Sequence, residues 1–328
     1  MLTSTITNKI IFITGGAGFI GTTLSKILIN NNKIVLYDNL SRNALKDTEL
    51  SNHPNLKFIQ GDILDEETLK NTLKKYNPMI VLHMAAIAGI DTTILSPTKT
   101  MIINMIGTHN ILQALSKLNI ISQIERFINF STSEIFGIKA FKVRETEPSQ
   151  IQPVGEARWT YSVSKLAGEH LTHAYHKEYG LNSVILRPFN VYGPGQVGEG
   201  ACHCFIKRAL KNEPLEIHGD GTQIRALCYI DDMIQGIVLA LEKKEAIGET
   251  FNIGNQEGVI TIRDLAERIV RIIQSKSPII YAPKRLADVD LRIPNTQKAE
   301  EMLGYRPCFG IDQGLGKTIE WYKNKPND

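Results

Sequence analysis

A short glycine-rich segment near the start of the chain constrains the fold more than any other part of the sequence. Residues 14–21 read Thr-Gly-Gly-Ala-Gly-Phe-Ile-Gly and contain the spacing G-x-x-G-x-x-G, after an apolar run at residues 10–14 and before a helical pattern at residues 19–30. The first glycine permits a tight turn, the second lets the backbone approach a pyrophosphate, and the third lets the helix pack on the strand. Amides at the helix N-terminus then face the phosphates. This context favours a dinucleotide site over a merely tight strand–helix turn.

Short apolar runs alternate with longer helical segments through the first half of the chain. The predicted strands are residues 10–14, 33–38, 56–60, 79–83, 126–131 and 183–187. Helical patterns such as residues 66–76 and 101–118 lie between them. This alternation predicts an α/β fold with a parallel sheet covered on both faces, a Rossmann-type doubly wound sheet. The continuously apolar strands fit burial on both sides.

The pattern changes after Arg187. A loop rich in proline and glycine follows, with Pro188, Gly193, Pro194, Gly195, Gly198 and Gly200. Shorter elements come next, and a capping box at residues 261–264 opens another helix. Because 328 residues exceed one typical domain, we expect a dinucleotide-binding domain at 1–187 and a smaller C-terminal α/β substrate lobe at 188–328. We expect this lobe to be interleaved with the last sheet strands.

Charge and apolar runs limit the partners. The net charge is +3 and no long basic run occurs, which argues against nucleic-acid binding through a polycationic surface. The most apolar stretch, residues 79–90, contains His83 and is shorter than the roughly 20 apolar residues of a membrane span. The four cysteines are too few for a disulfide scaffold. We therefore expect a cytoplasmic protein with no nucleic-acid or membrane partner.

Asp38 ends the second predicted strand, where an acidic residue binds ribose hydroxyls in dinucleotide sites. Its carboxylate accepts hydrogen bonds from a free 2′-hydroxyl but repels a 2′-phosphate. The nearby Arg42 would offset that repulsion if it faced the site, but we favour an exposed loop charge. The sequence therefore predicts NAD as the cofactor.

Tyr161-Ser162-Val163-Ser164-Lys165 has the spacing Y-x-x-x-K. On a helix, positions i and i+4 share a face. A lysine ammonium near the hydroxyl favours the phenolate and lowers the tyrosine pKa from about 10 toward neutrality, which makes Tyr161 a usable base for a sugar hydroxyl. The structural alternative is an amphipathic helix with a lysine that extends to water. The combination with the glycine turn favours the catalytic interpretation.

With these motifs, the chain resembles an extended short-chain dehydrogenase/reductase of the nucleotide-sugar epimerase/dehydratase group over nearly all of its length. The segments that carry the resemblance are residues 14–21, 38–41, 61–63, 83–86, 104–108, 131–137, 161–165, 187–195 and 229–232. The resemblance implies a Rossmann NAD-binding domain, a nucleotide-sugar-binding lobe and a nucleotide-diphosphate sugar as substrate.

The resemblance also implies roles for matching positions. The implied catalytic residues are Tyr161, Lys165, Thr132, Ser133 and Glu134. The implied cofactor-binding residues are Gly15, Gly18, Phe19, Ile20, Gly21, Asp38, Asn39, Asp62, Ile63, Ala85, Ala86, Asn104, Tyr161, Lys165 and Pro188. The implied substrate-binding residues are Asn190, Arg225, Arg292, Glu134 and His203, with the two arginines clamping the diphosphate. Structural alternatives remain, since Asn190 can cap a turn and Arg292 can be a surface charge.

Three reactions share the implied first step, in which Tyr161 removes the proton of the C4 hydroxyl as hydride passes from C4 to NAD. A 4-epimerase returns the hydride to the other face of C4. A 4,6-dehydratase removes the C5 proton, loses water and returns the hydride to C6, whereas a decarboxylase loses carbon dioxide from a 4-keto uronic acid. Related 4-epimerases often carry a small or aliphatic residue where Glu134 stands. Glu134 therefore favours a 4,6-dehydratase.

Two alternatives to the dehydratase stay open besides the epimerase. Residues 158–161 and 288–292 are similar to UDP-glucuronate decarboxylase, but Gly200 and Glu216 stand where that enzyme has basic residues. The fold can also serve a non-catalytic NAD-binding scaffold, although Tyr161, Lys165 and Thr132 favour an enzyme. The sequence leaves open the nucleotide base, the sugar and its stereochemistry.

Two further expectations concern metals and assembly. Cys202-His203-Cys204 suggests a metal, but Cys228 and Cys308 are single, so no structural zinc site is predicted. The resemblance implies a homodimer in which helices at about residues 101–118 and 161–178 form a four-helix interface. It also implies a place in polysaccharide biosynthesis.

Overall fold

The computed structural model describes residues 3–46, 48–285 and 287–325 of the chain. Its centre is a seven-stranded sheet in the order β12-β7-β5-β4-β1-β2-β3, in which every recorded strand pair is parallel. The strands are β1 Ile10–Thr14, β2 Lys33–Asp38, β3 Leu56–Gln60, β4 Ile80–His83, β5 Arg126–Phe130, β7 Ser183–Pro188 and β12 Thr250–Ile253. The predicted α/β fold with a doubly wound parallel sheet is confirmed.

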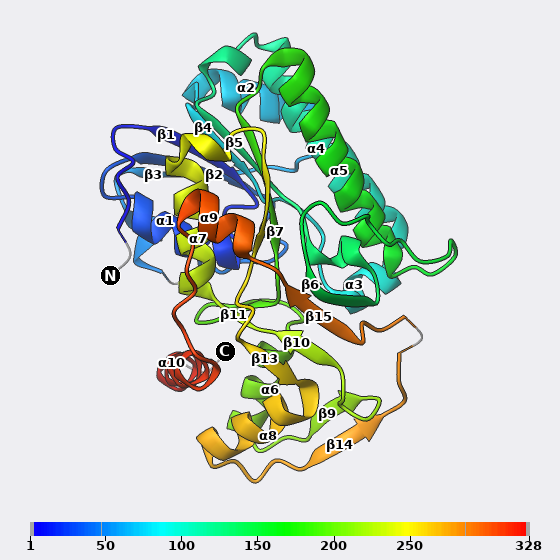
Figure 1. Cartoon of the computed structure of the whole chain (residues 1–328). Helices are drawn as coiled ribbons and strands as arrows, with labels where there is room; N and C mark the ends of the chain where they lie inside the picture. The colour runs from blue at the N-terminus through cyan, green and yellow to red at the C-terminus, as the bar shows by residue number, and fades with distance from the viewer. Residues whose placement is uncertain (1–2, 47, 286, 326–328) are drawn as a thin grey trace.

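Helices cover both faces of this sheet because successive side chains of a strand point to opposite faces. Phe12 of β1 packs in one buried cluster with side chains of α2 (Glu66–Tyr76) and α4 (Pro97–Lys117). Ile11 and Ile13 of the same strand pack in another cluster with α1 (Phe19–Leu28) and α7 (Ile230–Glu242). The long helix α5 (Trp159–Tyr179) lies beside α4 on the outside of the sheet (Figure 1).

The smaller lobe lies below the carboxyl ends of the central strands (Figure 1). It contains a four-stranded sheet in the order β13-β10-β15-β6 and two two-stranded pairs. Its strands are β6 Lys139–Val143, β8 Val191–Tyr192, β9 Leu215–His218, β10 Ile224–Ala226, β11 Cys228–Tyr229, β13 Val259–Thr261, β14 Ile279–Ala282 and β15 Leu291–Pro294. Its helices are α6 Ala201–Leu210 and α8 Ile262–Ile273, and α9 Gln297–Leu303 and α10 Ile311–Asn324 follow.

Each lobe contains a strand from the other side of residue 187 in the sequence. Strand β6 comes before that residue but pairs with β15 of the small lobe. Strand β12 comes after it and pairs with β7 at the edge of the large sheet. The chain therefore crosses between the two lobes more than once. Among the described residues, no helix is both long and apolar enough to span a bilayer.

Candidate active site

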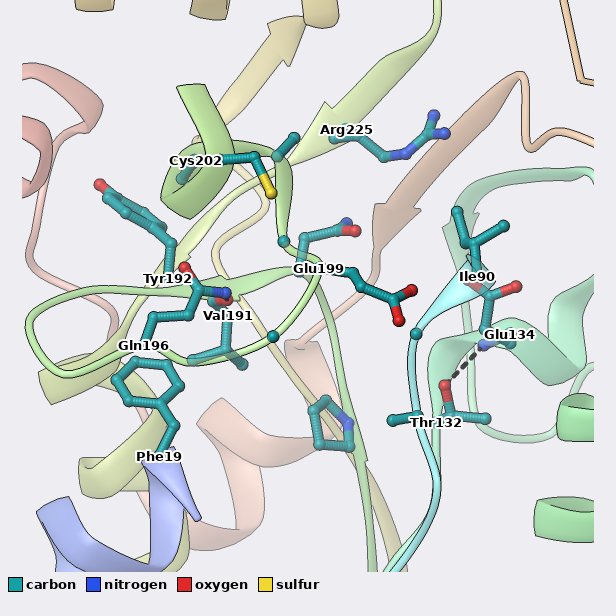
Figure 2. Close-up of a pocket in the computed structure, with 18 of the residues that line it drawn as sticks. Phe19, Ile90, Thr132, Glu134, Val191, Tyr192, Gln196, Glu199, Cys202 and Arg225 are labelled. Carbon is teal, nitrogen blue, oxygen red and sulfur yellow. Dashed lines mark hydrogen bonds between the residues drawn. The ribbon is translucent and has the colours of Figure 1, made fainter. Parts of the chain in front are cut away.

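A cleft of about 790 Å³ lies between the carboxyl ends of the central strands and the small lobe. Ligands of open α/β sheets bind at this edge of the sheet. The wall includes the glycine-rich turn, the segment after β4, the end of β5, the first turns of α5, and the loop that carries Glu199. Figure 2 shows Phe19, Thr132 and Glu199 on this wall. The predicted site residues on the wall are Gly15, Gly18, Phe19, Ile20, Gly21, Ala86, Thr132, Ser133, Glu134, Tyr161, Lys165, Pro188, Asn190 and Arg225.

The glycine-rich turn fits a pyrophosphate. Gly15 has φ +68°, and a Cβ at this position would lie 2.6 Å from the backbone nitrogen of Ala85. The turn therefore packs directly against the segment that follows β4. Gly18 precedes α1 and offers no side chain to cap it, so the first amides of the helix, which have no partner inside a helix, remain for an anion. These backbone donors could hold the phosphates of a dinucleotide.

Asp38 braces this turn from the end of β2. Its Oδ2 accepts a hydrogen bond from the backbone nitrogen of Ala17 at 3.0 Å, and its Oδ1 accepts one from that of Leu40 at 2.7 Å. Burial raises the pKa of Asp38, and these two bonds oppose the rise. Asp38 lies beside the turn but outside the wall of the cleft, so its contact with a ribose stays a prediction.

The remaining predicted cofactor residues lie outside the cleft wall. Asn39 donates to Oδ2 of Asp62 at 3.3 Å, and Ile63 is buried in the core. The backbone nitrogen of Ala85 donates to the Thr14 hydroxyl at 3.3 Å. Asn104 is 1% exposed and bonds the backbone of Ile87 with both its amide oxygen and its amide nitrogen. Asn104 therefore holds the segment after β4, and a direct contact of these residues with NAD stays a prediction.

Tyr161 and Thr132 meet on the wall from different elements. Tyr161 lies in the first turn of α5, and Thr132 lies just after β5. Burial raises the pKa of Tyr161 to about 12, and the nearby Thr132 side chain opposes the rise. We expected Lys165 to lower the Tyr161 pKa toward neutrality, and this is not met in the protein by itself. Burial disfavours both the phenolate of Tyr161 and the ammonium of Lys165. Burial also lowers the pKa of Lys165 to about 8.

Glu134 stands next to this pair and is held by two guanidinium groups. Arg292 donates to its Oε1, and Arg158 Nη2 lies 3.3 Å from its Oε2. Burial by itself would raise the pKa of Glu134, but Arg292, Arg158 and Arg225 together lower it below its usual value. Figure 2 shows the hydrogen bond in which the backbone nitrogen of Glu134 donates to the Thr132 hydroxyl. The two atoms lie 3.1 Å apart. The wall therefore carries an ionised carboxylate beside Tyr161.

Asp288 extends this group of charges. It lies 3.4 Å from Arg225 Nη2 and 3.8 Å from Arg158 Nη1. Three guanidinium groups thus face two carboxylates, which leaves a net charge of +1 in a largely buried cluster. Arg292 is 1% exposed and also donates to the Gly137 carbonyl oxygen at 2.6 Å, outside the cleft wall. It holds Glu134 in this structure, and its contact with a diphosphate stays a prediction.

A side-chain clasp that the sequence analysis missed joins two parts of the cleft wall. Glu199 accepts hydrogen bonds from the backbone nitrogens of Asp91 at 2.8 Å and Thr92 at 3.1 Å, and Arg42 Nη2 lies 3.4 Å from it. Asp91 and Thr92 belong to the short helix α3 (Ile90–Leu95), and Figure 2 shows the Glu199 side chain reaching toward Ile90 of that helix. Arg42 is thus a half-buried ion-pair partner on the cleft wall, so the expectation of an exposed loop charge is wrong. No residue spacing in the sequence signals this contact.

The predicted substrate residues divide between the wall and the interior. Asn190 lies on the wall with φ +38° and donates to the Ala226 carbonyl oxygen at 3.2 Å. His203 instead points to α10, where its Nδ1 lies 2.5 Å from the Tyr322 hydroxyl, and burial lowers its pKa to about 4. Its contact with substrate stays a prediction. Within the described part of the chain, no three histidine, cysteine or acidic side chains gather as metal ligands.

The comparisons with known proteins agree with this geometry. Residues 11–254 match the model of the NAD dependent epimerase/dehydratase family. The chain is 31% identical to UDP-N-acetyl-alpha-D-glucosaminuronate decarboxylase of Bacillus cytotoxicus, over 96% of this chain and 98% of that one. It is also 31% identical to dTDP-glucose 4,6-dehydratase of Haemophilus influenzae, over 95% and 97%.

A solved structure extends the likeness to the fold. UDP-glucuronic acid 4-epimerase from Bacillus cereus, in complex with UDP-glucuronic acid and NAD, superimposes with a TM-score of 0.84 at 33% identity. The match covers 96% of this chain and 99% of that one. The three relatives catalyse different reactions, so they support an NAD-dependent nucleotide-sugar enzyme without separating the reactions. The chain belongs to the NAD-dependent epimerase/dehydratase family.

Proposed function

We propose that this protein is an NAD-dependent nucleotide-sugar 4,6-dehydratase that acts through transient oxidation at C4 of the sugar. The observation that carries the proposal is the Glu134 carboxylate, which stands on the cleft wall beside Tyr161 and Thr132. Two arginine side chains keep it ionised. A carboxylate in this state can accept a proton from the carbon next to a ketone.

The side chains on the wall divide the proton transfers between them. Thr132 and Tyr161 hold the C4 hydroxyl. Tyr161 is neutral in the protein by itself, and it accepts the C4 proton as the phenolate that the positive charges of Lys165 and of bound NAD would favour. NAD, when bound, supplies the hydride acceptor for C4 and the hydride donor for C6. Glu134 takes the C5 proton, which the C4 ketone makes acidic, and passes it to the hydroxyl that leaves C6 as water. A proton from solvent then replaces the one lost from C5, and Tyr161 releases to solvent the proton that it took from the C4 hydroxyl, which balances the reaction.

This chemistry accounts for Glu134 better than 4-epimerisation does. An epimerase oxidises and reduces C4 only, so it needs no base at C5. Ser133 beside Glu134 is 4% exposed and carries no acidic proton, so Glu134 is both the base and the acid in the proposed elimination. The family membership supports an enzyme over a non-catalytic scaffold, and loss of turnover in Tyr161→Phe tests that choice.

Decarboxylation of a nucleotide uronate is the second candidate. The net charge of +1 in the cluster of Arg158, Arg225, Arg292, Glu134 and Asp288 favours an anionic group on the substrate. Glu216 counts against a uronate, because it also lies on the wall, with Oε1 3.4 Å from His218 Nε2. A 4-keto uronate would lose carbon dioxide from the position where the dehydratase loses water.

Product masses from UDP-, GDP-, CDP- and dTDP-sugars distinguish these reactions. A loss of about 18 mass units supports dehydration, a loss of about 44 supports decarboxylation, and an isomer of unchanged mass supports epimerisation. In heavy water, the dehydratase product also gains one deuterium at C5. A product that keeps the substrate mass and gains no deuterium would contradict the proposal.

A further inference from the structure

Glu169 is a buried carboxylate that the proposed reaction does not use. It lies on α5, one turn beyond Lys165 and two turns beyond Tyr161, so the three side chains share one face of the helix. Only 5% of Glu169 is exposed. A buried carboxylate is costly unless hydrogen bonds and an opposite charge compensate it, so its partners indicate what it does.

Three donors hold the Glu169 carboxylate. Arg187, near the end of β7, donates from Nε to Oε1 at 2.9 Å and from Nη2 to Oε2 at 2.7 Å. The Ser131 hydroxyl, directly after β5, donates to Oε1. The remaining Arg187 nitrogen, Nη1, donates to the Glu145 carbonyl oxygen at 3.0 Å. Residues of two neighbouring strands thus fix the carboxylate, and the two-pronged pair with Arg187 places a positive charge directly against it.

Lys165 precedes Glu169 by one helical turn and lies on the cleft wall, where it is 4% exposed. Its charge acts on Glu169 of the same helix and on His83 of β4, and Tyr161 lies one turn before it on α5. Arg187 on β7 bonds the Glu169 carboxylate. Burial, with the charge of Lys165, lowers the pKa of His83 to about 3, so His83 is neutral. Tyr161 is neutral as well, because burial raises its pKa.

We propose that Glu169 is a positioning residue whose carboxylate, fixed by Arg187 and Ser131, keeps the Lys165 side chain charged at the cleft wall. Burial lowers the pKa of Lys165 to about 8, and Glu169 opposes this fall. Without Glu169, Lys165 and Arg187 would be two buried cations with no carboxylate between them, and Lys165 would lose its proton at lower pH. This role does not depend on which reaction follows oxidation at C4.

The direct test is the titration of Lys165 in Glu169→Gln. The carbon-13 chemical shift of the lysine Cε reports ionisation, and the Lys165 signal is identified by its loss in Lys165→Arg. We expect the Lys165 pKa to fall by about one unit or more in Glu169→Gln, since one unit is about 1.4 kcal/mol of lost charge stabilisation. A folded Glu169→Gln protein in which Lys165 titrates as in the wild type would overturn the proposal.

Two further variants separate this effect from general destabilisation. Asp232 on α7 is also a buried carboxylate, 1% exposed, and accepts hydrogen bonds from the backbone nitrogens of Cys308 and Phe309. Asp232→Asn should leave the Lys165 titration unchanged. Glu169→Gln combined with Arg187→Gln removes the whole ion pair and leaves no unpaired charge at residue 187, which protects folding. A Lys165 pKa that falls less in this double variant than in Glu169→Gln supports the proposal, and one that falls further overturns it.

Discussion

The neighbours of each ionisable residue decide which form it takes on the cleft wall. Burial raises the pKa of Tyr161 to about 12 and lowers that of Lys165 to about 8, so exclusion of water favours the neutral form of both. Glu134 is also buried, but the nearby guanidinium groups outweigh the burial and lower its pKa. The group that is ready to act as a base near neutral pH is therefore Glu134.

Glu134→Gln should separate the two halves of the proposed reaction. The amide keeps the size of the side chain but cannot accept the C5 proton, so product formation should fall by about 10²–10⁴-fold. Oxidation at C4 should continue, and the absorbance of reduced cofactor should build up with a turnover substrate. The control is Glu216→Gln, a carboxylate on the same wall away from the arginine cluster. Wild-type turnover in Glu134→Gln would exclude this role.

The pH profile should respond to Arg158. Glu134 acts as a base only when ionised, so turnover falls as the pH drops through its pKa. Burial alone would raise that pKa, and Arg292, Arg158 and Arg225 bring it below the usual value. Arg158→Gln removes one of these charges, so the acidic limb of kcat should move to higher pH. Arg208→Gln, on the same wall but bonded to the Pro214 carbonyl oxygen at 3.3 Å, should leave the limb in place. An identical limb in Arg158→Gln and wild type would contradict the assignment.

At the scale of elements, the site is built where loops from distant parts of the sequence are fixed against each other. The turn between β1 and α1 packs on the segment after β4, and Asp38 at the end of β2 bonds the same turn. The clasp through Glu199 joins the loop before α6 to the start of α3. Backbone geometry at these contacts should therefore control cofactor binding as much as side-chain chemistry does.

Gly15→Ala tests the packing of the turn. Gly15 has φ +68°, and a Cβ there would lie 2.6 Å from the Ala85 backbone nitrogen. The strained backbone should cost about 1–3 kcal/mol of folding free energy, and displacement of the turn should weaken NAD binding measured by calorimetry. Gly316→Ala in α10 is the matched control, because no heavy atom lies within 4 Å of a Cβ there. That change should raise stability by about 0.5–1 kcal/mol. Unchanged NAD affinity in Gly15→Ala would refute the role of the turn.

At the scale of the whole molecule, the helices α4 and α5 lie side by side on the outside of the structure (Figure 1). They carry exposed apolar side chains. Ile102 and Ile106 of α4 are 44% and 45% exposed, and Val163 of α5 is 36% exposed. Burial of such side chains against a second copy would stabilise an assembly. We propose that two copies pair through these helices.

Ile106→Glu tests this pairing, because it places a charge in the proposed interface. Sedimentation should show a dimer for the wild type and a monomer for the variant. Ile280→Glu is the control, since Ile280 is 42% exposed but lies on β14 of the small lobe. A wild-type protein that sediments as a monomer at micromolar concentration would end the proposal.

The sequence predicted most of the central sheet, because its strands are short apolar runs that alternate with longer helical patterns. β1, β2 and β3 begin and end at the predicted residues. β12 was not predicted as a strand of this sheet, because its four residues pair with β7 only through the tertiary fold. The short helix α3 was also missed, since six residues carry too little periodicity.

In the candidate site too, local motifs were predicted from the sequence and long-range contacts were not. Local motifs bring Gly15, Thr132, Glu134 and Tyr161 to one wall. Long-range partners were not predicted, because nothing in local spacing brings Glu199 to Asp91. Glu169 did carry a signal, since it continues the four-residue spacing of Tyr161 and Lys165 on α5.

The central claim is that the sugar is oxidised at C4 and that the same hydrogen returns within one cycle. A nucleotide hexose that carries deuterium at C4 tests this most directly, with its position in the product read by nuclear magnetic resonance. The account predicts that the deuterium moves to C6 while the sugar loses water. Deuterium that remains on C4 of the product would show that this protein performs another reaction.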